Sequence, residues 1–311
     1  MAKTFFVVLG LILSVVALAD PTTQPTSQPA SKPSKPQVLP VDVPTYLQDI
    51  SVTIHAGNAQ GSGTLVTRNG VNYVWTAGHV VADQRRTRLV IDGKGGTRTV
   101  VEFDDVQIVK ELVEDGRSVG KISMDAEVIR YSSADTGEDL ALLRVRKKNF
   151  VSVSAEFYLD IKIPSISTDL VHCGSLKGQF GSNSVTTGIV SQIGRVFDGN
   201  IYDQTTCTAF PGSSGGGVFL KDGRYVGMLT RGAGETFNLI VPVRRLRPWA
   251  ERVGVAFAVD ANLPIPSDEE LKKQPVEDNG GSPQGKSYEG RSPGHASESK
   301  IKFWIAIPES E

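Results

Sequence analysis

Cysteine is scarce in this chain of 311 residues, which holds only Cys173 and Cys207. Two cysteines cannot form a disulfide framework for a chain of this length, so apolar packing must hold its core together. The pair could form one disulfide, or it could be two small buried apolar residues. The sequence leaves both alternatives open.

An excess of charge of either sign is also lacking. The net charge is −1 and the isoelectric point about 6.5, so no basic field is present to recruit nucleic acid or anionic lipid. No cluster of His, Cys, Asp or Glu has the spacing of metal ligands, and no repeat of the solenoid type is present. We therefore expect no metal, no organic cofactor and no nucleic-acid partner.

The first residues, "MAKTFFVVLGLILSVVALAD", combine an early lysine, an apolar run and small residues at 17 and 19. This order is typical of a secretory signal peptide, here residues 1–19, and predicts a periplasmic or extracellular protein with no membrane span after cleavage. The alternative is an uncleaved anchor, for which the apolar run is somewhat short.

Two polar stretches flank a central region. Residues 20–44 are rich in proline and poor in apolar residues, which predicts an extended linker. Residues 260–311 are polar up to about 299, which predicts a mostly disordered tail. The tail ends in the apolar "IKFWIAIPESE", which could dock as an added strand and restrain activity, or could be a fraying terminus. The predicted folded domain is 45–259.

Within this domain, short runs of β-branched and aromatic residues alternate with Gly, Asn and Asp. "DISVTIHAG", "VNYVWTAG" and "GRYVGMLTRG" are examples. Many short strands at near-regular spacing indicate a barrel or sandwich. One helix is predicted at about 243–254, with Pro248 in its first turn.

The stretch "PGSSGGG", 211–217, is a candidate nucleophile turn. A serine hydroxyl needs a base, and the oxyanion that it creates needs donors. A tight turn with Gly212 two residues before Ser214 lets the N–H groups of Gly212 and Ser214 point into one concavity. By itself the motif is weak, because Gly-Ser turns are common.

A base and an acceptor for that base are found elsewhere in the chain. His79 follows the small residues of "VWTAGHVV", whereas His55 and His172 lie in strand-like runs and His295 lies in the predicted tail. Asp139 leads directly into the apolar run "LALLRV", so its carboxylate should turn inward and pair with a histidine. Its rivals are three other carboxylates: Asp83, Asp135 and Glu138.

Together "TAGHVV", "DLALLRV" and "PGSSGG" resemble the three catalytic segments of the chymotrypsin-fold serine proteases, and of the bacterial HtrA/Deg branch in particular. The resemblance covers about 50–250. It implies two six-stranded antiparallel β-barrels, 46–150 and 151–245, with a C-terminal helix. It also implies that His79, Asp139 and Ser214 are catalytic and that the amides of Gly212 and Ser214 form the oxyanion hole.

The same resemblance implies further roles. Thr208 would lie at the base of the pocket for the residue before the cut bond, and Thr230, Arg231 and Gly232 would line the strand that pairs with substrate. Cys173 and Cys207 would lie on nearby strands. Three features depart from known members: Ser213 stands where secreted digestive proteases carry an acid, the segment Asp92–Asp135 is long, and the tail is too short and polar for the PDZ domain usual in HtrA/Deg enzymes.

The sequence thus predicts an exported serine endopeptidase that acts on polypeptides through an acyl-enzyme. The alternative hypothesis is a catalytically latent protein of the same fold that binds peptides or anchors to the envelope.

Overall fold

The computed structural model describes residues 42–91, 93, 95–114, 117–232, 236–278 and 307–308, all within one unit that spans residues 37–311. The predicted signal peptide and nearly all of the predicted linker lie outside these residues. Helix α1 (Val43–Asp49) begins inside the stretch predicted as linker, with Pro44 in its first turn. The folded part therefore starts at Val43 rather than at residue 45, because the side chains of Tyr46 and Leu47 anchor this helix in the core.

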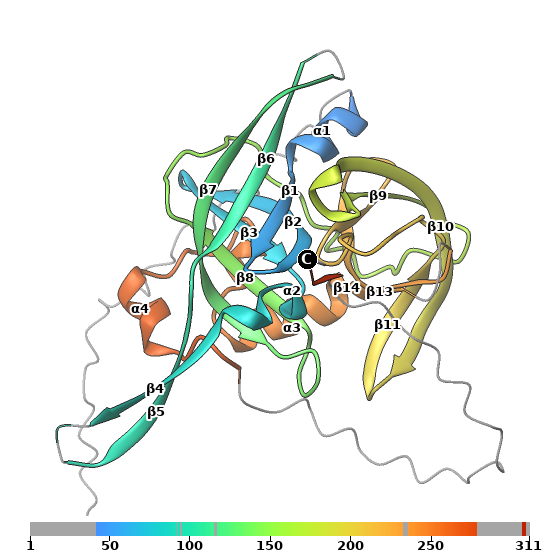
Figure 1. The fold of residues 1–311 in the computed structure, drawn as a ribbon. Helices are drawn as coiled ribbons and strands as arrows, with labels where there is room; N and C mark the ends of the chain where they lie inside the picture. Colours follow the sequence, from blue (N-terminus) through green and yellow to red (C-terminus); the bar gives the residue numbers. More distant parts are fainter. Residues whose placement is uncertain are drawn as a thin grey trace, which may run out of the picture. The chain divides into compact units, whose positions relative to one another are not determined.

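Six antiparallel strands of the first half form a ring (Figure 1). Their order is β1-β6-β7-β8-β3-β2, and pairing between β1 and β2 closes it. The strands are β1 (Ser51–Ala56), β2 (Ala59–Arg68), β3 (Val71–Thr76), β6 (Val106–Glu114), β7 (Arg117–Ser132) and β8 (Leu140–Val145).

The second half forms a closed barrel of six antiparallel strands, in the order β10-β11-β14-β13-β12-β9. These are β9 (Asp169–Leu176), β10 (Gly181–Phe197), β11 (Asn200–Thr205), β12 (Gly217–Leu220), β13 (Tyr225–Gly232) and β14 (Asn238–Pro242). The predicted fold class of two six-stranded antiparallel barrels is confirmed.

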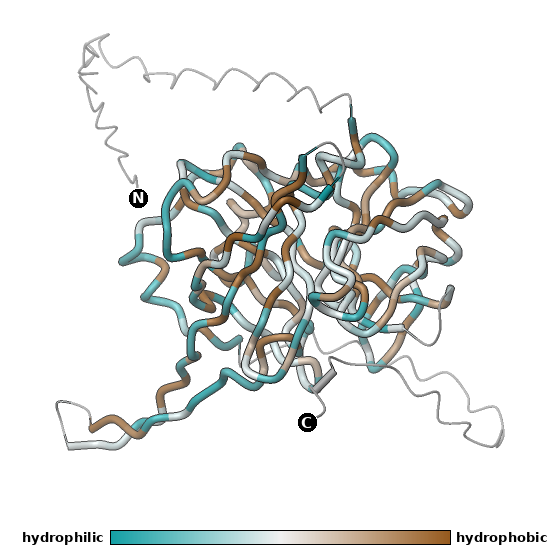
Figure 2. Tube along the Cα trace, turned by 45° about the horizontal axis from the view of Figure 1, so that its top comes forward, coloured by the Kyte–Doolittle hydropathy of each residue, from teal (hydrophilic) through white to brown (hydrophobic). Residues whose placement is uncertain are grey.

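The long segment between His79 and Asp139 forms two hairpins. One is β6–β7, and the other is a separate ribbon of β4 (Arg85–Ile91) with β5 (Thr97–Phe103). The ribbon projects from the first barrel, and part of it is hydrophobic (Figure 2). Leu89 and Ile91, at the end of β4, are apolar and exposed.

Helix α3 (Val243–Arg252) follows β14 directly and packs on the first barrel, because the Trp249 ring meets the Trp75 ring edge-on at 5.9 Å. Pro248 lies inside α3, so its predicted place in the first turn was wrong: the helix already begins at Val243. The remaining helical segments are α2 (Gly78–Val81), α4 (Asp268–Lys273) and three 3-10 turns, Ala82–Gln84, Gly178–Phe180 and Ala256–Ala258. Of the helices that the structure describes, none has the length and apolar character needed to cross a bilayer.

Residues 260–278 are folded, which corrects the prediction of a disordered tail from residue 260. Helix α4 starts with a reciprocal capping box between Ser267 and Glu270. The buried guanidinium of Arg130 donates to the Leu271 carbonyl, and Glu277 forms an ion pair with Arg85. Composition alone predicts disorder here. The capping box, the hydrogen bond from Arg130 and the Glu277–Arg85 ion pair stabilise the folded segment, although it makes few apolar contacts.

The apolar end of the chain contributes strand β15 (Ile307–Pro308), which pairs antiparallel with Gln60 and Ala59 of β2. This pairing lies on the edge of β2 opposite β1, just before Gly61. The sequence left open whether this segment docks, and the structure places two of its residues on the first barrel.

The two cysteines are free thiols, so the disulfide alternative was wrong. Cys173 belongs to the main core and Cys207 to a separate apolar cluster of the second barrel. Burial raises the pKa of Cys173 to about 12 and that of Cys207 to about 11, so both are protonated and unreactive at neutral pH.

His172 on β9 is fully buried, and its Nδ1 donates to the Gly217 carbonyl at 2.9 Å. Burial lowers the pKa of this imidazole to about 4. Between pH 6.5 and 4 this histidine is protonated in the unfolded chain but neutral in the folded chain, so the free energy of unfolding falls as the pH falls through this window. The lowered pKa corresponds to a loss of about 3 kcal/mol in the free energy of unfolding.

We therefore expect His172→Asn, which retains a donor for Gly217, to flatten the loss of stability between pH 7 and pH 4. Urea unfolding at a series of pH values measures this slope. His55→Asn is the control for loss of a histidine outside the core, since His55 is half-buried. Identical slopes for His172→Asn and the wild type would contradict the assignment.

Candidate functional site

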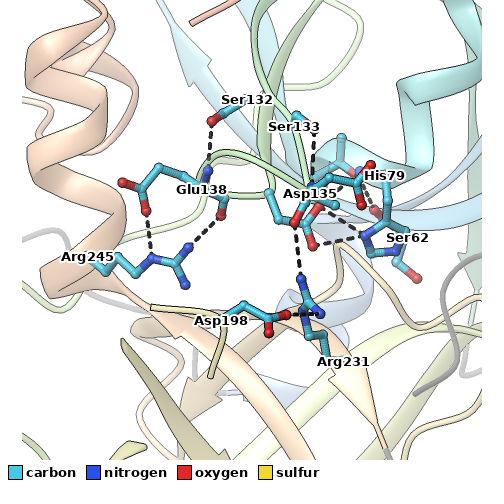
Figure 3. Close-up of polar contacts among 12 residues, drawn as sticks. Ser62, His79, Ser132, Ser133, Asp135, Glu138, Asp198, Arg231 and Arg245 are labelled. Atoms are coloured by element: carbon cyan, nitrogen blue, oxygen red, sulfur yellow. Dashed lines mark hydrogen bonds and ion pairs between the residues drawn. The ribbon is translucent and has the colours of Figure 1, made fainter. Parts of the chain in front are cut away.

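His79 lies in α2, directly after β3, with its side chain 6% exposed. Its Nδ1 is 3.0 Å from each carboxylate oxygen of Asp139, and its backbone N–H donates to the same carboxylate at 2.9 Å (Figure 3). Because a carboxylate only accepts, the ring proton is on Nδ1, and Nε2 carries the lone pair that a general base requires.

Asp139 lies immediately before β8 and is 1% exposed. Its φ of +56° is left-handed, a conformation that Asp tolerates better than most residues. Burial by itself raises the pKa of Asp139, but the His79 ring and its hydrogen bonds, together with the Arg231 charge, lower the pKa overall. The carboxylate is therefore ionised beside the imidazole.

The approach of His79 to Asp139 depends on Gly78. A Cβ on Gly78 would lie 2.2 Å from the Ser132 carbonyl oxygen and 3.3 Å from the Asp139 carbonyl carbon. Such contacts are too short for any side chain, so only glycine lets α2 pack against the start of β8.

None of the rival carboxylates bonds to His79. Glu138 forms a buried ion pair with Arg245 at 2.7 Å (Figure 3). Asp135 and Asp83 are exposed. Neighbouring carboxylates in this turn thus have different tasks: Glu138 joins the first barrel to α3, and Asp139 faces His79.

Ser214 is fully buried, in the turn that precedes β12. Its hydroxyl and the Nε2 of His79 are both buried and without a hydrogen-bond partner among the described residues. These two atoms are thus available for a reaction, although they are not bonded to each other.

The carbonyl groups of the nucleophile turn are held by donors from both barrels. Lys177 N–H donates to the Pro211 carbonyl at 2.8 Å. The Ser62 hydroxyl donates to the Gly212 carbonyl at 2.7 Å, and the Ser62 N–H donates to the Ser214 carbonyl at 2.7 Å. A trans peptide whose C=O points one way directs its N–H the other way, so Lys177 turns the Gly212 N–H away from itself.

The remaining groups of the turn are paired within it. Ser213 N–H donates to the Phe210 carbonyl at 2.9 Å, and Gly216 N–H donates to the Ser213 carbonyl at 3.0 Å. Among the described residues, the N–H groups of Gly212 and Ser214 are left without an acceptor. They are the two donors that the sequence predicts for an oxyanion.

Gly212 has φ +93°, as the third residue of the Phe210–Ser213 turn. A Cβ there would lie 2.3 Å from the Gly178 nitrogen and 2.6 Å from the Ser175 carbonyl oxygen. The turn therefore requires glycine on two counts, its left-handed backbone and its close approach to the loop after β9.

Four residues were predicted to bind substrate. Thr208 is half-buried and its carbonyl accepts from the Thr186 hydroxyl at 2.8 Å. Thr230, Arg231 and Gly232 end β13, and all three are buried.

Arg231 is largely buried, with 8% of its surface exposed. Its guanidinium lies 3.4 Å from the Asp198 carboxylate and donates to the Ala134 carbonyl at 3.2 Å (Figure 3). It also lies 5.1 Å from the centre of the Phe197 ring. Arg231 thus connects the β10–β11 hairpin to the turn that carries Asp139.

The sequence analysis missed Ser62 and Lys177, which hold the nucleophile turn from outside it. The signal for Ser62 was its position between two glycines in "GSG", where the chain can approach another backbone closely. Lys177 has φ +58°, which is unusual for lysine and invisible in the sequence.

The site has the groups for nucleophilic acyl chemistry: a serine, an oriented histidine, a buried carboxylate and two unpaired amides. Over the described residues, no group of three or more His, Cys, Asp or Glu side chains is arranged to hold a metal ion.

Comparison with known proteins matches residues 61–228 to the family described as the trypsin-like peptidase domain. A probable periplasmic serine endoprotease, DegP-like, from Halomonas elongata is 28% identical over 172 residues. The match covers 54% of this chain and only 28% of that protein.

Among solved structures, the serine endoprotease from Yersinia pestis is 18% identical with a TM-score of 0.49, covering 69% of this chain and 67% of that one. Deg5 has the same identity and TM-score, covering 70% of this chain and 94% of that one. The family match includes His79, Asp139 and Ser214 and spans more than half of the sequence. The chain belongs to the trypsin-like peptidase domain family.

Proposed function

We propose that the protein is an exported serine endopeptidase that uses Ser214, His79 and Asp139. The observation that carries this proposal is the orientation of His79: its Nδ1 is bonded to a buried carboxylate, which leaves Nε2 unpaired near a serine turn with two free amides. This is the division of roles that acyl transfer by a serine requires.

In the proposed reaction the Ser214 oxygen attacks the carbonyl carbon of a peptide bond while His79 Nε2 takes the hydroxyl proton. Asp139 holds the ring and stabilises the imidazolium that forms. The amides of Gly212 and Ser214 donate to the oxyanion. His79 then gives the proton to the leaving amine, and water hydrolyses the acyl-enzyme by the same steps.

The proposed substrates are unfolded envelope or secreted polypeptides. The periplasmic DegP-like relative and the predicted signal peptide support export. Thr208 at the pocket base is neutral and disfavours a strong Lys or Arg preference, and Thr230, Arg231 and Gly232 would line the substrate strand.

Ser214→Ala should abolish casein hydrolysis and labelling by a fluorophosphonate probe, because it removes the hydroxyl proposed as the nucleophile. The matched control is Ser191→Ala, which removes another buried hydroxyl with no described partner, far along β10. Circular dichroism checks that both variants fold. Labelling of folded Ser214→Ala at the wild-type rate would refute the assignment.

Asp139→Asn should lower kcat by about 10⁴-fold, because the amide favours the wrong ring tautomer. Asp135→Asn, an exposed carboxylate in the same turn, should retain wild-type activity. Steady-state hydrolysis of a fluorogenic casein measures both. Equal activity of the two variants would mean that Asp139 does not orient His79.

A second candidate is the latent form of the same fold, as a peptide-binding or envelope-anchoring protein. It is favoured by the burial of Ser214 Oγ and His79 Nε2, which are not bonded to each other. Strand β15 occupies the edge of β2 next to Gly61, and a Cβ at Gly61 would lie 3.1 Å from the Ser214 carbonyl oxygen. A chain segment on this edge would restrict access to the nucleophile turn.

Deleting residues 300–311 should therefore raise the fluorophosphonate labelling rate several-fold. Deleting only residues 309–311 is the matched control, because it keeps the two paired residues of β15. If both truncated chains have the wild-type rate and stability, β15 does not restrain the site. Absence of labelling in all three chains would instead favour the binding protein.

A further inference from the structure

Ser62 connects the first barrel to the nucleophile turn of the second. It lies on β2 between Gly61 and Gly63 and is 0% exposed. Three of its hydrogen bonds cross between the barrels, and each measures 2.7 Å.

The direction of the Ser62 hydroxyl follows from its partners. Its oxygen accepts from the Ser175 N–H, and an amide nitrogen can only donate. The single hydroxyl proton is therefore directed to the Gly212 carbonyl. The backbone N–H of Ser62 donates in turn to the Ser214 carbonyl.

One residue thus holds two of the four carbonyls of the turn Pro211–Ser214. The hydroxyl bond acts on the peptide that joins Gly212 to Ser213, whose N–H end is held by Phe210. A change in ψ of Gly212 or in φ of Ser213 that the other torsion does not compensate would rotate the two adjacent peptides, which carry the free amides. Gly212, on one side of this peptide, offers little resistance to such a change.

We propose that Ser62 is a positioning residue, an inference that rests on the proposed function. The Ser62 hydroxyl orients the Gly212–Ser213 peptide and thereby directs the amides of Gly212 and Ser214 toward the oxyanion. Ser62 does not touch the reacting atoms. It makes the geometry of the oxyanion site depend on the docking of the two barrels.

Without this hydroxyl, the Gly212 carbonyl would be buried with no donor, and an alternative orientation of the peptide would no longer be disfavoured. Loss of the Ser62 hydroxyl should raise the free energy of the transition state, where the oxyanion forms. It should hardly change the free energy of substrate binding.

The test uses Ser62→Ala, which removes the hydroxyl, and Ser62→Cys, which replaces it with a larger and much weaker donor. The matched control is Thr53→Val, which deletes a buried hydroxyl that contacts Ser175 Oγ at 2.5 Å but not the nucleophile turn. All chains are full length, and thermal unfolding measures the stability cost of each.

We expect both Ser62 variants to lose about 10- to 100-fold in kcat on fluorogenic casein, with KM within about twofold. The rate constant for phosphonylation of Ser214 by a fluorophosphonate should fall in parallel, because its phosphoryl oxygen also requires the two amides. Thr53→Val should lose stability by a similar amount while its kcat and labelling rate stay within about twofold of the wild type.

Wild-type rates in a folded Ser62 variant would overturn the positioning role, and so would an equal loss of kcat in Thr53→Val. A loss expressed in KM alone would also overturn it. These outcomes differ from failure of the proposed function, in which the wild-type chain itself is neither labelled nor active.

Discussion

The architecture depends on the way in which both barrels hold the carbonyls of one turn. Lys177 from the second barrel and Ser62 from the first hold the carbonyls of residues 211, 212 and 214. Once every carbonyl has a donor, the amides of Gly212 and Ser214 are the groups left over. The proposed oxyanion site thus follows from the pairing of the surrounding carbonyls, because a buried C=O without a partner is costly.

The second constraint is the buried carboxylate of Asp139. Burying an unpaired charge costs several kcal/mol, so Asp139 is tolerated only with His79 and the more distant positive charge of Arg231. The same bonds that stabilise the carboxylate set the tautomer of the imidazole. Stability of the fold and orientation of the base therefore rest on one pair, and Gly78 lets its two elements approach each other.

Much of the fold could be predicted because strand periodicity and turn residues are local signals. The two barrels and the helix after β14 were both recognisable in this way. His79 and Asp139 were predicted as a pair, and the structure brings them together because each stands at the end of a strand in one sheet. The boundaries were less predictable: α1 packs into the core formed by the strands, and α4 is held by Arg130, which lies 141 positions before Leu271.

Sequence by itself determined the chemistry available: one serine in a glycine turn, one histidine after small residues, and one aspartate before an apolar strand. Only the tertiary structure decided which groups hold the turn. Ser62 lies 150 residues before its partner Gly212, and Lys177 lies 34 residues before its partner Pro211. Backbone hydrogen bonds between barrels leave no local pattern, because any residue can supply the amide and only the fold sets its direction.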